Sequence, residues 1–136
     1  MRLREDLQVM EEFLAEGKEY LAKGDPVQAS GKLYKAVKEC IKLLAEKEKL
    51  PEYEEARREG RWWSRLLLRA ARNLAQRKGE EKIFVTWALA FDELHIWGFH
   101  EKALSVEHVR LDVPHVEWLV NYTKEALNKG ENRFKK

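Results

Sequence analysis

Apolar residues recur along the first part of the chain at alternating spacings of four and three positions. The series is Leu3, Leu7, Met10, Leu14, Gly17 and Leu21. This spacing places one continuous seam on one side of an α-helix. The glycine at position 17 either lets another helix approach closely or simply costs stability. The pattern predicts a first amphipathic helix with one buried face.

A sharp turn around Gly24 separates this helix from a second one. The Asp25 side chain can accept hydrogen bonds from the first turn of a helix, and Pro26 has the φ favoured at the first helical position. Gln28 completes a capping-box pattern. The apolar positions that follow keep helical spacing: Leu33, Val37, Cys40, Ile41 and Leu44. We expect a helix from Pro26 to about Lys49, antiparallel to the first.

Proline and glycine divide the middle of the chain. Pro51 ends the second helix, and the acidic stretch 52–55 is predicted to be a loop or a short helical turn. Gly60 breaks the chain again. A third helix is predicted from Arg61 to Lys78, with Gly79 as its C-terminal stop.

The segment from Glu80 to Trp97 is apolar nearly all round a predicted fourth helix. Its apolar residues are Ile83, Phe84, Val85, Trp87, Leu89, Phe91, Leu94, Ile96 and Trp97. Such a helix is either central to a bundle or shared with a second subunit. Because a chain of 136 residues has little room to enclose a whole helix, we expect a homodimer in which the partner covers its outer side.

A proline lies inside the last helical pattern. Nevertheless, one 4-3-4-3-4 phase continues across Pro114, through Val109, Val113, Val116, Val120, Thr123 and Leu127. With Ser105 as N-cap, the pattern predicts one helix from Ser105 to Asn128 kinked at Pro114, or two nearly collinear helices, the second capped by Asp112. We adopt the kinked single helix.

Together these elements predict an all-α fold: an up-and-down bundle of about five helices, formed by residues 1–128 as a single domain. Residues 129–136 are predicted to be a frayed tail. A composition of 44% hydrophobic and 37% charged residues is typical of globular chains rather than disordered ones. Asn and Gln together number seven while Glu, Lys and Arg dominate, a bias typical of hyperthermophiles.

Charge and cysteine usage limit the functional classes. The net charge of +2 excludes strong global attraction to nucleic acid, so any such role requires a local patch. The single cysteine, Cys40, cannot form an internal disulfide, and we expect a buried thiol in a reducing cytoplasm. The N-terminus is too charged for a signal peptide, and the chain has no apolar run long enough for a membrane span, so we expect neither a signal peptide nor membrane association.

Arginines recur through the predicted third helix and just before it, without an interleaved acid after Glu59. The stripe consists of Arg58, Arg61, Arg65, Arg69 and Arg72. Like charges at this spacing repel by about 0.2–0.5 kcal/mol per pair, so a helix face that is merely solvated would be expected to carry both acidic and basic residues. Guanidinium groups suit phosphate, and Trp62 or Trp63 could offer a stacking plane if exposed. Phosphate binding, a solvated face and docking to acidic residues of a partner chain all remain open.

Histidines cluster at the end of the predicted fourth helix. His95 shares a side with apolar residues, which favours a core role, and His100 follows Gly98. The two are five apart and do not meet on a regular α-helix, so they do not form a metal pair there. Acid–base work by His100 is the catalytic alternative. There is no phosphate loop, dinucleotide fingerprint or CxxC pair, and we predict neither a cofactor nor a metal site.

Two stretches resemble the archaeal PaREP family of small helical proteins, which the resemblance places in the HEPN (higher eukaryote and prokaryote nucleotide-binding) superfamily. The first runs from Glu19 to Lys38, with a Gly-Asp turn followed by Ala-Ser-x-Lys-x-x-Lys-Ala. The second runs from Leu94 to Glu101, followed by Val106–Val109. The resemblance implies a helical bundle, usually dimeric, from thermophilic archaea.

Many HEPN proteins are ribonucleases that use an arginine, about four to six further residues and a histidine beside a dimer interface. They often pair with a nucleotidyltransferase-type partner protein in toxin–antitoxin or defence-type systems. The matching place here begins with His95 where the arginine would stand and ends with His100. A protonated His95 would be needed to supply the positive charge of that arginine.

The leading hypothesis is therefore a HEPN-like, non-enzymatic binding or partner-interaction module that contacts RNA or a nucleotide through the arginine stripe. One alternative is a metal-independent endoribonuclease in which His95 and His100 act on the phosphodiester. The other is a structural subunit whose stripe docks a protein partner.

Overall fold

The computed structural model describes the backbone of residues 2–134 and the side chains of residues 5–129. The chain forms seven helical elements in this order: α1 (Arg2–Ala22), α2 (Pro26–Lys47), α3 (Pro51–Glu59), α4 (Ser64–Lys78), α5 (Glu81–Leu89), the π-helix η1 (Ala90–His100) and α6 (Val106–Phe134). The described residues include no strand. The all-α prediction is confirmed.

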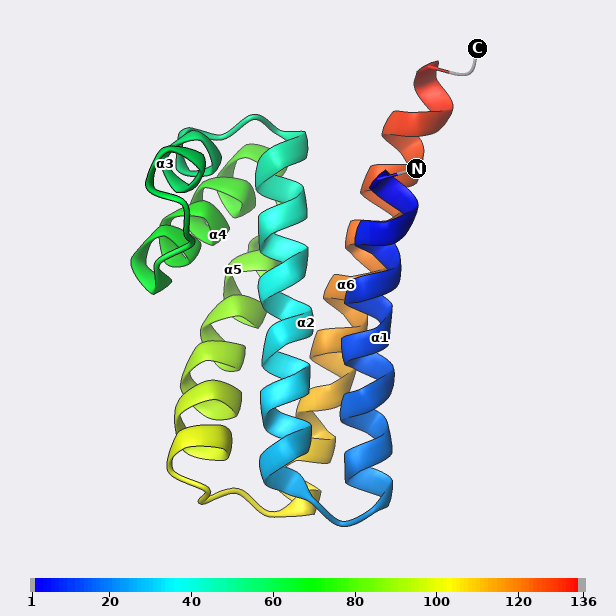
Figure 1. The fold of residues 1–136 in the computed structure, drawn as a ribbon, viewed down its shortest axis with the longest axis vertical. Coiled ribbons are helices and arrows are strands. Elements are labelled where there is room, and N and C mark those ends of the chain that lie inside the picture. Colours follow the sequence, from blue (N-terminus) through cyan, green and yellow to red (C-terminus); the bar gives the residue numbers. More distant parts are fainter. Residues whose placement is uncertain (1, 135–136) are drawn as a thin grey trace.

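Helix α2 is the centre of the bundle. In Figure 1, α1 and α6 run along one side of it, α5 and η1 lie on the other, and α3 and α4 gather near its C-terminal end. Helix α2 contacts every other described helix. The most central helix is therefore α2, and the apolar 80–97 segment is not enclosed. Within that segment Val85 and Trp97 remain 50% and 48% exposed.

The turn before α2 has the predicted chemistry. The Asp25 Oδ1 atom accepts a hydrogen bond from the Gln28 backbone N–H at 3.0 Å, and Pro26 is the first residue of the helix. The Asp25 N–H donates to the Tyr20 carbonyl at 2.9 Å. In a full capping box the Gln28 side chain would accept from the Asp25 N–H, but here the Tyr20 carbonyl takes that place. This bond fixes the reversal from α1 to α2.

Gly17 allows α1 to approach α2 closely. A Cβ atom built there would lie 2.6 Å from Leu33 Cδ2, and Leu33 is fully buried. Of the two interpretations left open by the sequence, close helix approach is therefore the one that the structure supports.

Of the two predictions for residues 52–55, a loop or a short helical turn, the helical one is confirmed, because Pro51 starts the short helix α3 and the buried Glu52 accepts a hydrogen bond from Asn73 of α4. Two predicted boundaries were wrong. Helix α4 starts at Ser64, not Arg61. The predicted fourth helix divides into α5 and η1, whose π-helical winding changes which side chains share a face.

Helix α6 passes through Pro114 without ending, so the predicted single helix is confirmed and the two-helix alternative is wrong. Its N-terminus is capped by Ser105 Oγ, which accepts from the His108 N–H at 3.1 Å. The helix extends beyond Asn128 to Phe134. The kink at Pro114 and the fraying of the tail stay predictions, and residues 135–136 lie outside the described part of the chain.

Cys40 is buried as expected, and its Sγ lies 3.1 Å from Met10 Sδ. Burial raises the pKa of the thiol to about 12, so it stays protonated and does not act as a nucleophile. No helix in the described part of the chain is long and apolar enough to cross a bilayer.

Candidate functional site

The five predicted arginines do not form one stripe. Arg58 lies on α3 and Arg61 in the link to α4, so only Arg65, Arg69 and Arg72 share a helix. All five side chains are exposed. The arginines are divided because the chain is not helical between Glu59 and Ser64, whereas the predicted third helix began at Arg61.

Several of these arginines are engaged within the chain. The Arg69 guanidinium lies 3.8 Å from carboxylate oxygens of Glu52 and of Glu55 on α3. The Arg72 guanidinium stands 4.7 Å from the centroid of the Phe84 ring. Exposed ion pairs contribute little stability. These contacts nevertheless give Arg69 and Arg72 partners within the chain, as expected for arginines on a solvated helix face.

The tryptophan pair does not present a free stacking surface. Trp62 is half-buried and packs against the core. Trp63 is 38% exposed, but the Arg61 guanidinium already lies 3.4 Å from its ring centroid. Its Nε1–H donates to Glu59 at 2.7 Å. On the face of Trp63 that Arg61 covers, a base could stack only by displacing the guanidinium.

The two predicted histidines do meet, because the segment that holds them is a π-helix. Backbone bonds in a π-helix join residues five apart, and side chains at that spacing share a face. The His95 and His100 rings lie edge to face, with centroids 4.5 Å apart. The expectation that this spacing keeps them apart was wrong, since it assumed an α-helix.

Aromatic neighbours fix the orientation of His95. Its ring stacks on that of Tyr34 of α2 at 4.3 Å and tilts against Phe91 at 5.4 Å. Tyr34 in turn packs on the buried Trp87 at 5.8 Å. His95 is thus held by residues from two elements, while the exposed His100 lies at the C-terminal end of η1.

Helices α2 and η1 come together through small residues. A Cβ built on Gly98 would lie 2.2 Å from Ser30 Oγ and 2.6 Å from Ser30 Cβ, so η1 can lie this close to α2 only with glycine there. The Phe99 ring packs against Gly31 in the same way. This close approach is what places the His95 ring over Tyr34.

Beside His95 there is a pocket of about 260 Å³ between the two helices. Lys32, Tyr34, Lys35 and Lys38 of α2 and His95 and Phe99 of η1 line its walls, and no carboxylate belongs to the lining. The Lys32 ammonium is 3.2 Å from Glu16 of α1, outside the pocket. The pocket therefore combines cationic groups with an aromatic floor.

Burial and neighbouring positive charges both lower pKa values in the pocket. Burial lowers the pKa of Lys38, and Lys42 and Lys35 lower it further while Glu39 opposes them. Burial lowers the pKa of His95, and His100 and Lys38 act in the same direction. An anion in the pocket would favour the charged form of both groups. Burial raises the pKa of Tyr34 to about 12, so its phenol stays neutral.

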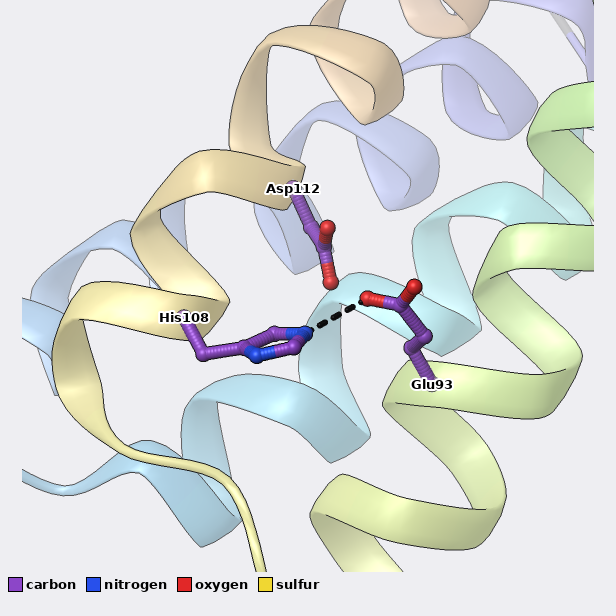
Figure 2. A group of neighbouring side chains, drawn as sticks. All are labelled: Glu93, His108 and Asp112. Atoms are coloured by element: carbon purple, nitrogen blue, oxygen red, sulfur yellow. Dashed lines mark hydrogen bonds and ion pairs between the residues drawn. The ribbon is translucent and has the colours of Figure 1, made fainter.

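A second group of ionisable side chains lies at the contact between η1 and α6. Figure 2 shows Glu93 pointing from η1 toward His108 and Asp112 of α6. The His108 Nε2 atom is 2.7 Å from Glu93 Oε1. Burial, together with a hydrogen bond to the adjacent Glu93 carboxyl and the charge of that carboxyl, raises the pKa of Asp112 to about 7, and His108 opposes the shift.

Sequence reasoning named His95 of the pocket and the adjacent His100 but missed Tyr34, the three lysines of the pocket and the Glu93–Asp112 pair. Lys32, Lys35 and Lys38 follow one another at intervals of three positions, and residues three apart are neighbours on the surface of a helix. That spacing was a usable signal for the lysines. For Glu93 and Asp112 the only local signal was that Asp112 and His108 are four apart on one helix.

Comparisons with known proteins place the fold among archaeal proteins. The model of the archaeal PaREP1/PaREP8 family matches residues 5–120. A crystal structure of a protein from Sulfolobus solfataricus is 36% identical, with a TM-score of 0.79 over 88% of this chain and 96% of that one. The solution structure of the same structural-genomics target gives 36% identity and a TM-score of 0.76, over 88% and 91% of the two chains. No curated protein matches significantly.

Proposed function

Starting from the fact that this chain belongs to the archaeal PaREP1/PaREP8 family, we propose that it is a non-enzymatic module that binds a phosphate-bearing ligand, single-stranded RNA or a nucleotide. The pocket between α2 and η1 is the binding site in this proposal, in place of the arginines near α4. The observation that carries it is a pocket lined by three lysines and a histidine without a carboxylate.

The chemistry of the pocket suits a nucleotide unit. Lysine ammonium groups bind phosphate as point charges, and His95 adds a ring nitrogen beside them. Aromatic rings accept a stacked base regardless of its identity, and Phe99 is partly exposed at the wall of the pocket. The volume of about 260 Å³ is smaller than that of common small-molecule pockets, roughly 300–1,000 Å³. It fits one phosphate group with part of its nucleoside.

Lys38→Met is expected to weaken binding of a fluorescein-labelled, mixed-sequence RNA by about tenfold, since one bond to a charged group contributes about 1.5 kcal/mol. Methionine keeps an apolar stem beside Tyr34, whose ring centroid lies 6.0 Å from the Lys38 ammonium. Fluorescence anisotropy across a salt series provides the measurement. The slope of log Kd against log salt should fall by about 0.7 for a single strand.

Lys47→Met is the matched control, because Lys47 is an exposed lysine of the same helix outside the pocket. Its Kd should stay within about twofold of the unmodified chain. Loss of affinity in Arg65→Ala with none in Lys38→Met would move the site to α4. Failure of both RNA and free nucleotides to bind at low salt would refute the proposal.

The same samples test the enzymatic alternative, which the contact between the His95 and His100 rings specifically favours. In that reaction a neutral imidazole removes the 2′-hydroxyl proton and the oxygen attacks the adjacent phosphorus. The P–O5′ bond then breaks, and an imidazolium protonates the leaving oxygen. Cleavage that is absent with 2′-deoxy substrate and in His100→Ala would overturn the non-enzymatic assignment.

We also propose that the chain forms a homodimer through the outer side of α5 and η1. These two elements form one continuous rod in Figure 1, and they expose Val85 and Trp97. Trp97→Glu should raise the dimer dissociation constant at least tenfold, because it places a charge in an apolar contact. Leu111→Glu on α6, where Leu111 is 74% exposed, is the control. Light scattering that finds the unmodified chain monomeric would contradict the proposal.

A further inference from the structure

Glu93, His108 and Asp112 bring three metal-binding atoms together from two elements. Each offers one ligand atom, and these atoms lie within 4.8 Å of one another. His108 and Asp112 are four apart on α6, which places them on one face of the helix. Glu93 reaches them from η1, and Figure 2 shows the three side chains converging on one point.

One oxygen atom of the buried Asp112 carboxylate is left without a hydrogen-bond partner among the described residues. The Asp112 side chain is only 5% exposed, and the oxygen without a partner in the described part of the chain is the buried Oδ2 atom. Figure 2 shows this carboxylate directed toward Glu93 and the His108 ring. A buried carboxylate without a donor is costly, and a second carboxylate beside it adds repulsion. A cation between them would remove both penalties.

We propose that Glu93, His108 and Asp112 form a binding site for a divalent transition-metal ion, with zinc or manganese as the class of ion it accepts. The imidazole nitrogen suits zinc and the two carboxylate oxygens suit both zinc and manganese, whereas magnesium prefers oxygen ligands alone. Metal–ligand bonds of about 2.0–2.2 Å leave neighbouring ligand atoms roughly 3–3.5 Å apart. Metal binding would bring the present separations, which are all within 4.8 Å, into that range.

The site is enclosed on one side and open on the other. Asp112 is buried, whereas the His108 and Glu93 side chains are 46% and 34% exposed. Three protein ligands with an open side leave room for water in the remaining coordination positions, unlike the closed four-ligand sites of structural zinc. The ion would cross-link η1 to α6, and none of its three ligands lines the histidine–lysine pocket. The inference does not depend on the proposed ligand of that pocket.

The test uses the full chain, first treated with a chelator and then titrated separately with Zn²⁺ and Mn²⁺ in a calorimeter. We expect one ion per chain and a rise in the thermal unfolding temperature on binding. Co²⁺ offers a second readout, because its visible absorption reports nitrogen and oxygen ligands directly. His108→Ala and Asp112→Asn should each weaken Zn²⁺ binding at least tenfold and abolish the temperature shift.

His115→Ala is the matched control, since His115 is an exposed histidine on the same helix outside the cluster. It should leave both the affinity and the temperature shift unchanged. Asp112→Asn preserves shape and removes a carboxylate repulsion, so the metal-free variant should fold. If it does not, Glu93→Gln carries the same test. Equal affinities in the His108→Ala and His115→Ala variants would overturn the proposal. Absence of binding at millimolar Zn²⁺ and Mn²⁺ would also overturn it and leave a carboxyl pair that shares a proton.

Discussion

Replacing Trp87 by alanine is expected to lower the free energy of unfolding by about 3–5 kcal/mol, the range for deleting a large aromatic side chain from a core. Trp87 is 2% exposed and is among the largest fully buried side chains of the described chain. Its ring packs on Tyr34 at 5.8 Å and on Phe91 at 5.7 Å. Both of these rings also contact His95. The substitution would therefore leave a cavity directly behind the candidate pocket.

Urea unfolding followed by far-UV circular dichroism measures this effect without depending on tryptophan fluorescence. Trp63→Ala is the comparison, since Trp63 is partly exposed and held by one hydrogen bond and by Arg61. It should cost less than about 1.5 kcal/mol. Equal losses in the two variants would show that the described core around Trp87 is wrong.

Gly98→Ala is expected to lower the free energy of unfolding by about 1–3 kcal/mol, the cost of overpacking a filled contact. In an open helix the same change would stabilise the chain by about 1 kcal/mol, because alanine has the higher helix propensity. Here the new Cβ would meet Ser30 Cβ at 2.6 Å. The sign of the change thus reports how closely η1 lies against α2.

A double-mutant cycle with Ser30→Gly isolates the contact. Removing the Ser30 side chain deletes the two nearest atoms that the new methyl group would meet and leaves the Glu93 carbonyl oxygen at 3.2 Å, so the double variant should recover part of the lost stability. Full additivity of the two changes would contradict the described packing of η1 on α2. The RNA affinity of Gly98→Ala should fall along with its stability, since the pocket is formed by the same two elements.

The parts of the fold that sequence predicted best are those decided by local chemistry. The Asp25–Pro26 turn needs only the residues beside it, and the unbroken apolar phase across Pro114 identified α6 as one helix. The sequence left residues 52–55 open between a loop and a short helical turn, because nothing local marks an acidic residue there as buried. In the structure the buried Glu52 contacts Asn73 and Arg69, both on α4.

The candidate sites were predicted less well because each depends on two elements and on the winding of η1. An apolar pattern on nearly all sides does not distinguish an α-helix from a π-helix, so the meeting of His95 and His100 could not be derived from their spacing. Lys35 and Lys38 resemble an ordinary solvated face until η1 closes the pocket over them. Glu93 and Asp112 are 19 positions apart and meet only because α6 folds back along η1.

The winding of η1 decides whether its two histidines can act together. His95 and His100 are five positions apart, and their rings lie in contact because the backbone hydrogen bonds of a π-helix join residues at that interval and keep such side chains on one side. In an α-helix, with 3.6 residues per turn, side chains five positions apart would point about 140° away from each other. Rewinding η1 into an α-helix would therefore separate the two rings without any change of sequence.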